Sequence, residues 1–359
     1  MSVIVLSAGG TGGHLFPAQA LAGVLARRGR AIVVMTDTRF ANYATTFPNA
    51  RIETVPSSPF NAVAAPFKIM AGTAVAFTKL LKLKPAAVVG FGGYPSVPVM
   101  LAASLARFPT AIIEQNAVVG RANRLVMNRV KVVAAAFPIA RFAPSDKSKI
   151  VLTGNPLRPE VEALWGTPYD VPQSGGPLRL LVFGGSQGAR AMSEIVPAAL
   201  TRLPHDLKRR LSVVQQCRPE DMEMVRQIYA NAEIGCELQS FFTDLPKRMA
   251  DSHLVIARSG AGTVAELMAI GRPAILVPLP GALDDNQTPN ADILARAEAG
   301  WRVAQADLTP DALAQMLIKI FAEPRDLARR AACAHAIAVP QAAEKLADVV
   351  ENLAGRRAA

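Results

Sequence analysis

Two glycine-rich segments of similar design lie about 175 residues apart, and each could bind an anion. The first is GGTGGH at Gly9–His14, and the second is GGSQGAR at Gly184–Arg190. Each follows an apolar run typical of a buried strand and precedes a helical pattern, so backbone N–H groups and a helix N-terminus would point at one place, most often at a phosphate. One such turn is a weak signal. Two, each opening its own half of the chain, predict paired Rossmann-like domains with a ligand between them.

A third segment, RSGAGTVAE at Arg258–Glu266, has the same strand-then-helix context. Glu266 falls one turn inside the predicted helix, where its carboxylate could accept two hydroxyl groups of a ribose. Asn286 and Gln287 follow the next predicted strand and return side-chain amides to the same edge of the sheet. These groups match a nucleotide sugar, with amides for its diphosphate, a carboxylate for its ribose and side-chain amides for its sugar hydroxyls.

Other glycine motifs fit less well. The dinucleotide fingerprint would require glycine at the position of Leu15, and neither turn is followed by the Lys-Ser/Thr of a P-loop. The nucleophile elbow G-x-S-x-G nearly fits with Ser186 at its centre, but none of the downstream histidines stands in a context distinctive of a triad. Ser186 is therefore interpreted as a phosphate or hinge contact.

The chemistry expected of such a site is sugar transfer without a metal ion or another cofactor. The chain lacks Asp-x-Asp, the usual metal-holding motif, so backbone amides and arginine would have to stabilise the leaving diphosphate. Attack by an acceptor hydroxyl group on such a sugar nucleotide would require a base. His14 has a suitable intrinsic pKa, although its role could be limited to bonding the turn backbone. Glu114 or a phosphate of the acceptor is the alternative base.

Short apolar strands alternate with amphipathic helices along the whole chain, which predicts two parallel sheets covered on both faces. The predicted strands are Val3–Leu6, Ala31–Met35, Arg51–Val55, Ala86–Val89, Thr110–Ile113, Lys131–Ala134, Leu178–Phe183, Leu211–Gln215, Ile234–Leu238, His253–Ile256, Ala274–Val277 and Trp301–Val303. The main predicted helices are Phe16–Arg28, Phe67–Leu83, Arg190–Leu200, Pro219–Ala230, Val264–Ile270 and Pro310–Phe321. A boundary is expected in the Gly/Pro-rich stretch Gly154–Pro159, which gives domains of residues 1–155 and 156–339, with a final helix in 340–359 packing back on the first domain.

Charge is distributed unequally between the two halves. Residues 1–155 hold 17 Lys+Arg and 4 Asp+Glu, whereas residues 156–359 hold 22 and 24. A basic half favours a polyanionic partner, either nucleic acid or anionic lipid. Nucleic acid is not expected, because the basic residues are scattered and no reading motif is present.

The segment Phe67–Lys84 favours lipid. On a helical wheel Lys68, Lys79 and Lys82 fall within about 60° of one another, beside an apolar face of roughly 160° that includes Phe77. Such a helix suits an anionic membrane interface, although a buried helix with solvated lysines would show the same pattern.

Neither a membrane span nor an oxidising compartment is expected. The uncharged stretch of 21 residues at Ala86–Ala106 is long enough to cross a bilayer, but its glycines and prolines favour a strand, a turn and a helix. The chain's three cysteines include no close pair, and the N-terminus lacks the basic region of a signal peptide.

Six segments, in this order and at these intervals, resemble the MurG family of peptidoglycan glycosyltransferases over essentially the whole chain. They are GGTGGH with Pro17, GFGGYPS at Gly90–Ser96, EQN at Glu114–Asn116, GNPLR at Gly154–Arg158, GGSQGAR and RSGAGTVAE. The resemblance implies a GT-B fold and inverting, metal-independent transfer of N-acetylglucosamine from UDP-N-acetylglucosamine to the 4-hydroxyl of the muramyl sugar of lipid I, which gives lipid II. It also implies peripheral attachment to the cytoplasmic face of the inner membrane, with cell-wall synthesis or division proteins as further partners.

The resemblance also implies site residues. Donor contacts would be Arg158, Ser186, Ala261, Gly262, Thr263, Val264, Ala265, Glu266, Asn286 and Gln287, with Phe242 near the uracil and with Thr11, Gly12, Gly13 and Asn116 from the other domain. The acceptor diphosphate would lie on Gly10, Gly92, Gly93 and Tyr94. The chain departs from the family pattern at Ile113, where histidine is frequent, at Asn286, which replaces the first of two glutamines, and at Gly262, where larger residues are common. These departures concern single contacts and leave the reaction unchanged.

Two alternatives stay open at this point. A different GT-B enzyme, such as a UDP-N-acetylglucosamine epimerase, would consume the donor without an acceptor. A non-catalytic sugar-nucleotide or membrane scaffold would release no UDP.

Overall fold

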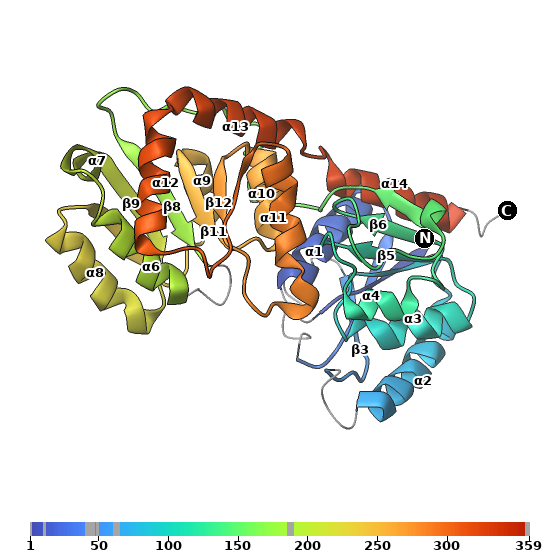
Figure 1. Ribbon diagram of the computed structural model, residues 1–359. Coiled ribbons are helices and arrows are strands. Elements are labelled where there is room, and N and C mark those ends of the chain that lie inside the picture. Colours follow the sequence, from blue (N-terminus) through green and yellow to red (C-terminus); the bar gives the residue numbers. More distant parts are fainter. Residues whose placement is uncertain are drawn as a thin grey trace. The chain divides into compact units, whose positions relative to one another are not determined.

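The computed structural model describes residues 2–9, 12–39, 47, 50–59, 65–184 and 190–355. The chain divides into two compact units, shown in Figure 1. Unit 1 is Met1–Pro159 together with Val339–Ala359, and unit 2 is Glu160–Ala338. The first division therefore lies at the end of the Gly/Pro-rich stretch Gly154–Pro159.

Unit 1 contains a seven-stranded parallel sheet in the order β3-β2-β1-β4-β5-β6-β7. Its strands are β1 (Val3–Ser7), β2 (Ala31–Thr36), β3 (Ala50–Thr54), β4 (Ala87–Gly90), β5 (Thr110–Glu114), β6 (Val132–Ala135) and β7 (Ile150–Leu152). The central strands are apolar on both faces because helices cover both. The strand order reverses between β1 and β4, and the carboxyl ends of strands at such a point are where ligands bind in sheets of this kind.

The helices of unit 1 form two layers. Helices α1 (Gly12–Arg27) and α14 (Ala342–Gly355) pack in one core with the face of β1 that carries Ile4 and Leu6. Helices α2 (Ala65–Leu83), α3 (Ser96–Leu105) and α4 (Arg121–Val126) cover the opposite face, where Val5 points. Right-handed crossovers place helices on opposite faces when the chain moves in opposite directions across the sheet.

The C-terminal helix α14 is held on α1 by both packing and charge. Leu346 and Val350 are fully buried in the shared core. The guanidinium of Arg28 donates to Glu344 at 2.5 Å, to Asp348 at 2.6 Å and to Glu351 at 2.9 Å. The last helix is therefore an integral part of unit 1, although it is separated from the rest of that unit by all of unit 2.

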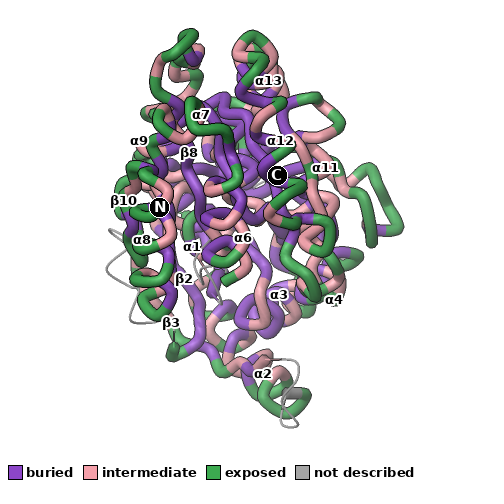
Figure 2. The backbone as a smooth tube through the Cα atoms, turned by 60° about the vertical axis from the view of Figure 1, so that its left-hand side comes forward, coloured by how far each residue is buried: buried purple, intermediate pink, exposed green. Residues whose placement is uncertain are grey.

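Unit 2 contains a six-stranded parallel sheet in the order β10-β9-β8-β11-β12-β13. Its strands are β8 (Leu178–Phe183), β9 (Leu211–Gln216), β10 (Gly235–Gln239), β11 (Leu254–Ala257), β12 (Ala274–Leu276) and β13 (Gly300–Arg302). The order reverses between β8 and β11, the counterpart of the reversal in unit 1. Figure 2 shows buried backbone along the strands and exposed residues on the outer turns of the helices.

Three long helices of unit 2, α6 (Arg190–Leu200), α8 (Met222–Asn231) and α12 (Pro310–Ala322), share one hydrophobic core with the sheet. The remaining helices are α5 (Pro159–Glu162), α7 (His205–Arg210), α9 (Leu245–Asp251), α10 (Ala261–Ile270), α11 (Gln287–Arg296) and α13 (Pro324–Ala336). Since α9, α10 and α11 belong to crossovers that run the other way across the sheet, they lie on its second face.

The prediction of parallel sheets covered on both faces is confirmed. Every predicted strand is present, with ends that shift by at most about one residue. Strand β7 was not predicted, because its apolar run of three residues is shorter than the roughly four to eight typical of a strand; it lies at the sheet edge and is partly or fully exposed. The first helix begins at Gly12, earlier than the predicted Phe16, so His14 lies in its first turn.

Candidate functional site

His14 lies against the glycine loop that follows β4. A Cβ atom added at Gly92 would lie 3.3 Å from Nε2 of His14, and one added at Gly93 would lie 3.4 Å from its Nδ1. Gly92 and Gly93 have φ angles of 81° and 71°, and a Cβ at Gly93 would also lie 2.7 Å from the carbonyl oxygen of Gly9. Only glycine combines this conformation with such close approach. Gly9 and His14, the first and last residues of the first glycine-rich segment, therefore lie against the Gly92–Gly93 loop.

Burial lowers the pKa of His14 to about 4. The imidazole is therefore neutral at physiological pH, because the enclosed ring loses the hydration that stabilises its charged form. A neutral imidazole can accept a proton, as a general base must, but a pKa of about 4 makes this ring a weaker base than a free histidine side chain.

Tyr94 belongs to a polar cluster at the carboxyl end of β2. Its hydroxyl donates to Asp37 Oδ2 at 3.1 Å, and Nη2 of Arg39 donates to the same carboxylate oxygen at 3.0 Å. The Arg39 guanidinium also lies 5.0 Å from the centre of the Tyr94 ring. The Asp37 side chain is 5% exposed and that of Arg39 is 56% exposed. Burial, followed by the charge of Asp37, raises the pKa of Tyr94 to about 12, so its hydroxyl stays a donor.

Glu114 is buried, and four hydrogen bonds occupy its carboxylate. Oε1 accepts from the backbone N–H of Asn116 at 3.0 Å and from its side-chain amide at 3.4 Å. Oε2 accepts from the backbone N–H of Gly120 at 2.9 Å and from Nδ2 of Asn123 at 2.9 Å. Burial raises the pKa of Glu114 in spite of these donors. The arrangement orders the loop from Asn116 to Asn123 and leaves little room for Glu114 to accept a further proton from a substrate.

Arg158 and Asn116 also lie in unit 1. The Arg158 guanidinium lies 5.0 Å from the centre of the Phe16 ring on α1, so it is near the helix that carries Gly12, Gly13 and His14. Three of the predicted contacts, Gly10, Thr11 and Ser186, lie outside the described residues.

In unit 2 the segment after β11 leads directly into α10, whose N-cap is Gly260. Ala261, Gly262 and Thr263 are partly exposed in its first turn, and a Cβ at Gly262 would meet nothing within 4 Å. The first N–H groups of a helix have no partner within it, so this end can receive an anion. Val264 differs from the other predicted contacts, because its side chain is fully buried and its N–H bonds to the oxygen of Gly260 at 3.0 Å. Ala265 is also buried, whereas Glu266 is partly exposed one turn into the helix.

Residues at the start of α11 hydrogen-bond to Ser259, in the turn that leads into α10. Ser259 Oγ donates to the backbone oxygen of Gln287 at 2.8 Å, and Nδ2 of Asn290 donates to the backbone oxygen of Ser259 at 3.2 Å. The Gln287 side-chain oxygen accepts from the N–H of Leu279 at 3.0 Å. Gln287 therefore shapes the loop between β12 and α11, and Asn286 is its N-cap residue.

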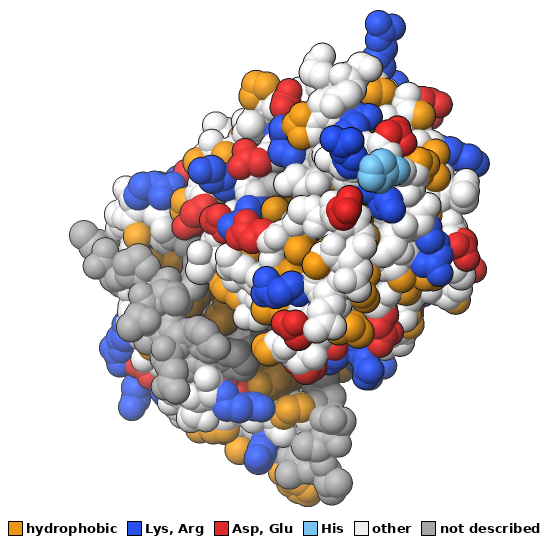
Figure 3. All heavy atoms as spheres, turned by 90° about the vertical axis from the view of Figure 1, so that its left-hand side faces the viewer, with side chains coloured by type: hydrophobic (Ala, Val, Ile, Leu, Met, Phe, Trp, Pro, Cys, Tyr) orange, Lys and Arg blue, Asp and Glu red, His pale blue; other side chains and the backbone are white. Residues whose placement is uncertain are grey.

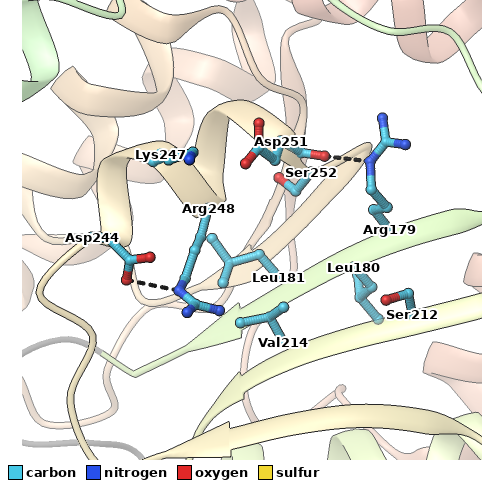
Figure 4. A pocket seen from close by; sticks show the side chains of 10 residues that line it. All are labelled: Arg179, Leu180, Leu181, Ser212, Val214, Asp244, Lys247, Arg248, Asp251 and Ser252. Atoms are coloured by element: carbon cyan, nitrogen blue, oxygen red, sulfur yellow. Dashed lines mark hydrogen bonds and ion pairs between the residues drawn. The ribbon is translucent and has the colours of Figure 1, made fainter.

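Phe242, the residue expected near the uracil, is only 5% exposed. The Arg248 guanidinium lies 4.4 Å from the centre of its ring. Arg248 also lines a pocket between α9 and the strands β8 and β9, shown in Figure 4. The cations of this pocket include Arg248, which is paired with Asp244 at 2.8 Å, and Arg179, which donates to the backbone oxygen of Asp251 at 2.5 Å. The pocket lies beside the sheet face, and none of its lining residues belongs to the α10 turn.

The predicted membrane helix α2 presents an exposed apolar stripe. Phe67 and Met70 are 75% and 69% exposed, and Leu81 is also exposed. At about 100° per residue these three side chains fall within roughly 60° of one another. Gly72, on the opposite side, packs against the rest of unit 1, because a Cβ there would collide with the carbonyl oxygen of Pro56. The exposed stripe is therefore distinct from the face that docks the helix.

Two of the side chains predicted to lie in that membrane surface are placed differently by the structure. Nζ of Lys79 donates to Glu53 Oε2 at 2.5 Å and to the backbone oxygen of Thr54 at 3.1 Å, so this lysine is engaged within unit 1. Phe77 is partly buried against the core. Lys68 and Lys82 are exposed. The helical wheel alone did not reveal the ion pair, since Glu53 is 26 residues away in sequence.

Within the described part of the chain, no group of three or more His, Cys, Asp or Glu side chains is arranged to hold a metal ion. No helix among those residues is long and apolar enough to cross a membrane, and Ala86–Ala106 contains β4, the glycine loop and α3 as predicted. Figure 3 shows acidic and basic side chains interspersed on the face that it presents.

Two parallel α/β units, each with a glycine-rich turn where its strand order reverses, define the class of GT-B glycosyltransferases. Comparisons with known proteins agree. The chain matches the glycosyltransferase family 28 N-terminal domain over residues 4–135 and the family 28 C-terminal domain over residues 179–352. The chain belongs to glycosyltransferase family 28, within the MurG group that its motifs resemble.

The individual relatives support this assignment. A Rhodopseudomonas palustris protein named UDP-N-acetylglucosamine--N-acetylmuramyl-(pentapeptide) pyrophosphoryl-undecaprenol N-acetylglucosamine transferase is 52% identical over 359 residues, covering 98% of each chain. The crystal structure of Acinetobacter baumannii MurG has a TM-score of 0.83 and 33% identity, covering 98% of this chain and 100% of that one. A UDP-GlcNAc 2-epimerase from Neisseria meningitidis is similar in fold alone, with a TM-score of 0.68 and 12% identity, covering 98% and 100%.

Proposed function

We propose that this glycosyltransferase moves N-acetylglucosamine from UDP-N-acetylglucosamine to the 4-hydroxyl of the muramyl sugar of lipid I, with inversion and without a metal ion. The observation that carries the proposal is full-length similarity at 52% identity to a protein named for this transfer. The sites within each unit are compatible with it. Unit 2 offers a helix N-terminus for a diphosphate, and unit 1 offers a neutral imidazole beside a glycine loop.

His14 is the proposed base for the attacking hydroxyl. Its ring is neutral above a pH of about 4, and it lies against Gly92 and Gly93, the loop proposed to hold the acceptor diphosphate with Tyr94. Glu114 is assigned a different role, because its four hydrogen bonds order the loop that carries Asn116. The variant His14→Ala is expected to lower kcat at least a hundredfold while the affinity for UDP-N-acetylglucosamine is retained. A small change in kcat would move the base elsewhere.

The donor is proposed to bind with its diphosphate at the first turn of α10. Ala261, Gly262 and Thr263 offer N–H groups there, and Glu266 would accept the ribose hydroxyls. The space beside Gly262 leaves that turn open to a ligand. Glu266→Gln is expected to weaken donor binding and to leave the affinity for the acceptor unchanged, which initial rates at varied donor and acceptor concentrations would measure.

We further propose that α2 attaches the protein to anionic lipid on the cytoplasmic side of the membrane. The exposed Phe67, Met70 and Leu81 would enter the interface, while Lys68 and Lys82 would contact anionic headgroups. Each lysine near such a surface contributes about 1 kcal/mol.

Liposome sedimentation tests this surface. Binding is expected to need anionic lipid, to weaken with salt and to fall strongly in the double variant Lys68→Glu/Lys82→Glu. The double variant Lys319→Glu/Lys345→Glu changes net charge equally at exposed positions on α12 and α14 and serves as the control. Equal loss in both double variants would show that only net charge matters and would remove α2 from the proposal.

One assay tests the reaction itself. The protein is incubated with UDP-N-acetylglucosamine and a lipid I analogue, and the product and its anomeric configuration are identified. A β-linked disaccharide whose formation survives a chelator is expected. Donor consumption without acceptor would favour an epimerase, and absence of UDP release would favour a scaffold; either result would overturn the proposal.

A further inference from the structure

The Arg258 side chain connects the carboxyl ends of three neighbouring strands of unit 2. It directly follows β11, and its Nη1 donates to the backbone oxygens of Val277 and Pro278, each at 3.1 Å, just beyond β12. Its Nη2 donates to Oε1 of Gln305 at 2.6 Å, in the loop that follows β13. Gln305 is 47 residues away in sequence, so only the fold brings the two side chains together.

Arg258 is buried, and its hydrogen-bond acceptors are neutral. Among the residues that the structure describes, no Asp or Glu forms an ion pair with it, and its Nε is buried without a hydrogen-bond partner. A buried guanidinium depends strongly on each acceptor, because an unpaired N–H group of a charged side chain costs more than a neutral one. Gln305 supplies the one side-chain acceptor in this set of hydrogen bonds.

The position of Arg258 matters because the next two residues form the turn into α10. On the α11 side, two hydrogen bonds hold this turn. Ser259 Oγ donates to the backbone oxygen of Gln287, and Nδ2 of Asn290 donates to the backbone oxygen of Ser259. On the other side of the turn, Arg258 hydrogen-bonds to residues just beyond β12 and in the loop beyond β13. Among the described residues, no other side chain of this turn does so. The direction of the N–H groups in the first turn of α10 therefore depends on both supports.

We infer that Gln305 is a positioning residue for the donor diphosphate. By holding the Arg258 guanidinium, it fixes the Ser259–Gly260 turn and so aims the first N–H groups of α10. This inference rests on the proposed function, since it requires that α10 receives the diphosphate of UDP-N-acetylglucosamine. Gln305 itself touches no substrate.

Three variants test the inference. Gln305→Leu keeps a similar side-chain size but removes the acceptor, and we expect the KM for UDP-N-acetylglucosamine and the Kd for UDP to rise about tenfold. The KM for the acceptor should change little, whereas the midpoint of thermal unfolding should fall by a few degrees, because the buried guanidinium loses an acceptor. Gln305→Glu keeps an oxygen at the same place and should stay within about threefold of the parent in all these values. Gln227→Leu, an exposed glutamine on α8, is the matched control for an added apolar side chain.

A double-mutant cycle separates positioning through Arg258 from a general structural effect. In an Arg258→Lys background, Gln305→Leu should add less than about twofold to the KM for the donor, because the guanidinium it orients is already gone. If Gln305 had a merely structural role, its replacement would lower the fraction of active protein, and hence the apparent kcat. The KM for the donor would then not rise relative to the KM for the acceptor.

The outcomes are distinct. If the parent protein does not bind UDP or UDP-N-acetylglucosamine, the proposed function fails. If the parent binds and Gln305→Leu binds equally well, only the role of Gln305 is overturned. If Gln305→Leu does not fold, the comparison passes to Gln305→Ala, which also lacks a side-chain acceptor, and a donor KM that is the same in Gln305→Ala as in the parent would equally overturn the inference.

Discussion

The contact between the Gly92–Gly93 loop and the Gly9–His14 turn can be tested with Gly93→Ala. Gly93 has a φ of 71°, and a Cβ there would lie 2.7 Å from the backbone oxygen of Gly9 and 3.4 Å from Nδ1 of His14. The substitution therefore combines a conformational cost with a collision against backbone. The oxygen of Gly9 belongs to the backbone and cannot rotate away as a flexible side chain could.

The magnitude follows from these two parts. Alanine in the left-handed region costs about 1–2 kcal/mol. Relief of the collision requires a shift of about 0.7 Å and costs a further 1–3 kcal/mol or so, as for an overpacked core. Because a misplacement of about 1 Å at a reacting group can cost a hundredfold in rate, we expect kcat to fall on the order of tenfold to a hundredfold.

Gly29→Ala is the matched control. Gly29 has a φ of 76°, but nothing lies within 4 Å of its added Cβ. The free energy of unfolding of Gly29→Ala should therefore fall only by the conformational cost of about 1–2 kcal/mol, and its kcat should be unchanged. Denaturant unfolding gives the two free energies of unfolding, and initial rates with saturating donor and acceptor give the two kcat values. Equal losses of stability together with equal kcat values in the two variants would refute the contact between the loop and the turn, and with it the placement of His14.

Other perturbations follow from the same structure. Glu114→Gln should lower stability by about 3 kcal/mol and reduce activity, because its new amide N–H group faces two donors; denaturant unfolding measures this, and a fully stable variant would contradict the network of hydrogen bonds. Burial lowers the pKa of His253 to about 4, so below a pH of about 6.5 the unfolded chain binds a proton that the folded chain excludes, and stability falls towards pH 4. Between pH 7 and 4, the free energy of unfolding of His253→Asn should fall by about 3 kcal/mol less than that of the parent. Parallel curves of unfolding free energy against pH for the two proteins would show that this histidine is not the cause. Gly72→Ala should destabilise through its collision with Pro56. Gly23→Ala on α1, whose Cβ would meet only Nη1 of Arg27 at an ordinary contact distance of 3.8 Å, should stabilise by up to about 1 kcal/mol; changes of the same sign in thermal unfolding would show that α2 is not docked through Gly72.

Much of the fold was readable from local sequence, because buried parallel strands are nearly continuous apolar runs. Val3–Leu6 and Leu178–Phe183 could be assigned for this reason, and the glycines after them marked the points where a backbone must turn sharply. Edge strand β7 escaped notice because its apolar run, Ile150–Leu152, is only three residues long and too short to stand out as a strand. The MurG resemblance was equally local, since it rests on short motifs in order along the chain.

The site residues show where local reasoning ends. The sequence marked His14 as the candidate base and Glu114 as an alternative. Only the folded structure shows that the His14 ring lies against Gly92 and Gly93 and that burial lowers its pKa. Only the donors from Asn116, Gly120 and Asn123 show that the oxygens of Glu114 are occupied. Lys79 on helix α2 is a similar case, because its partner Glu53 lies on strand β3, 26 residues away in sequence.

The sequence by itself determined the class of fold, the family and the positions of the glycine turns, because these depend on apolar periodicity and on backbone freedom, which are properties of neighbouring residues. The tertiary structure alone decided the protonation state of His14, the role of Glu114, the side of α2 that is exposed and the support that Gln305 gives to Arg258. These properties depend on burial and on hydrogen bonds between residues far apart in the chain. The dielectric surroundings and the partners of a side chain do not exist until the sheets and helices have packed.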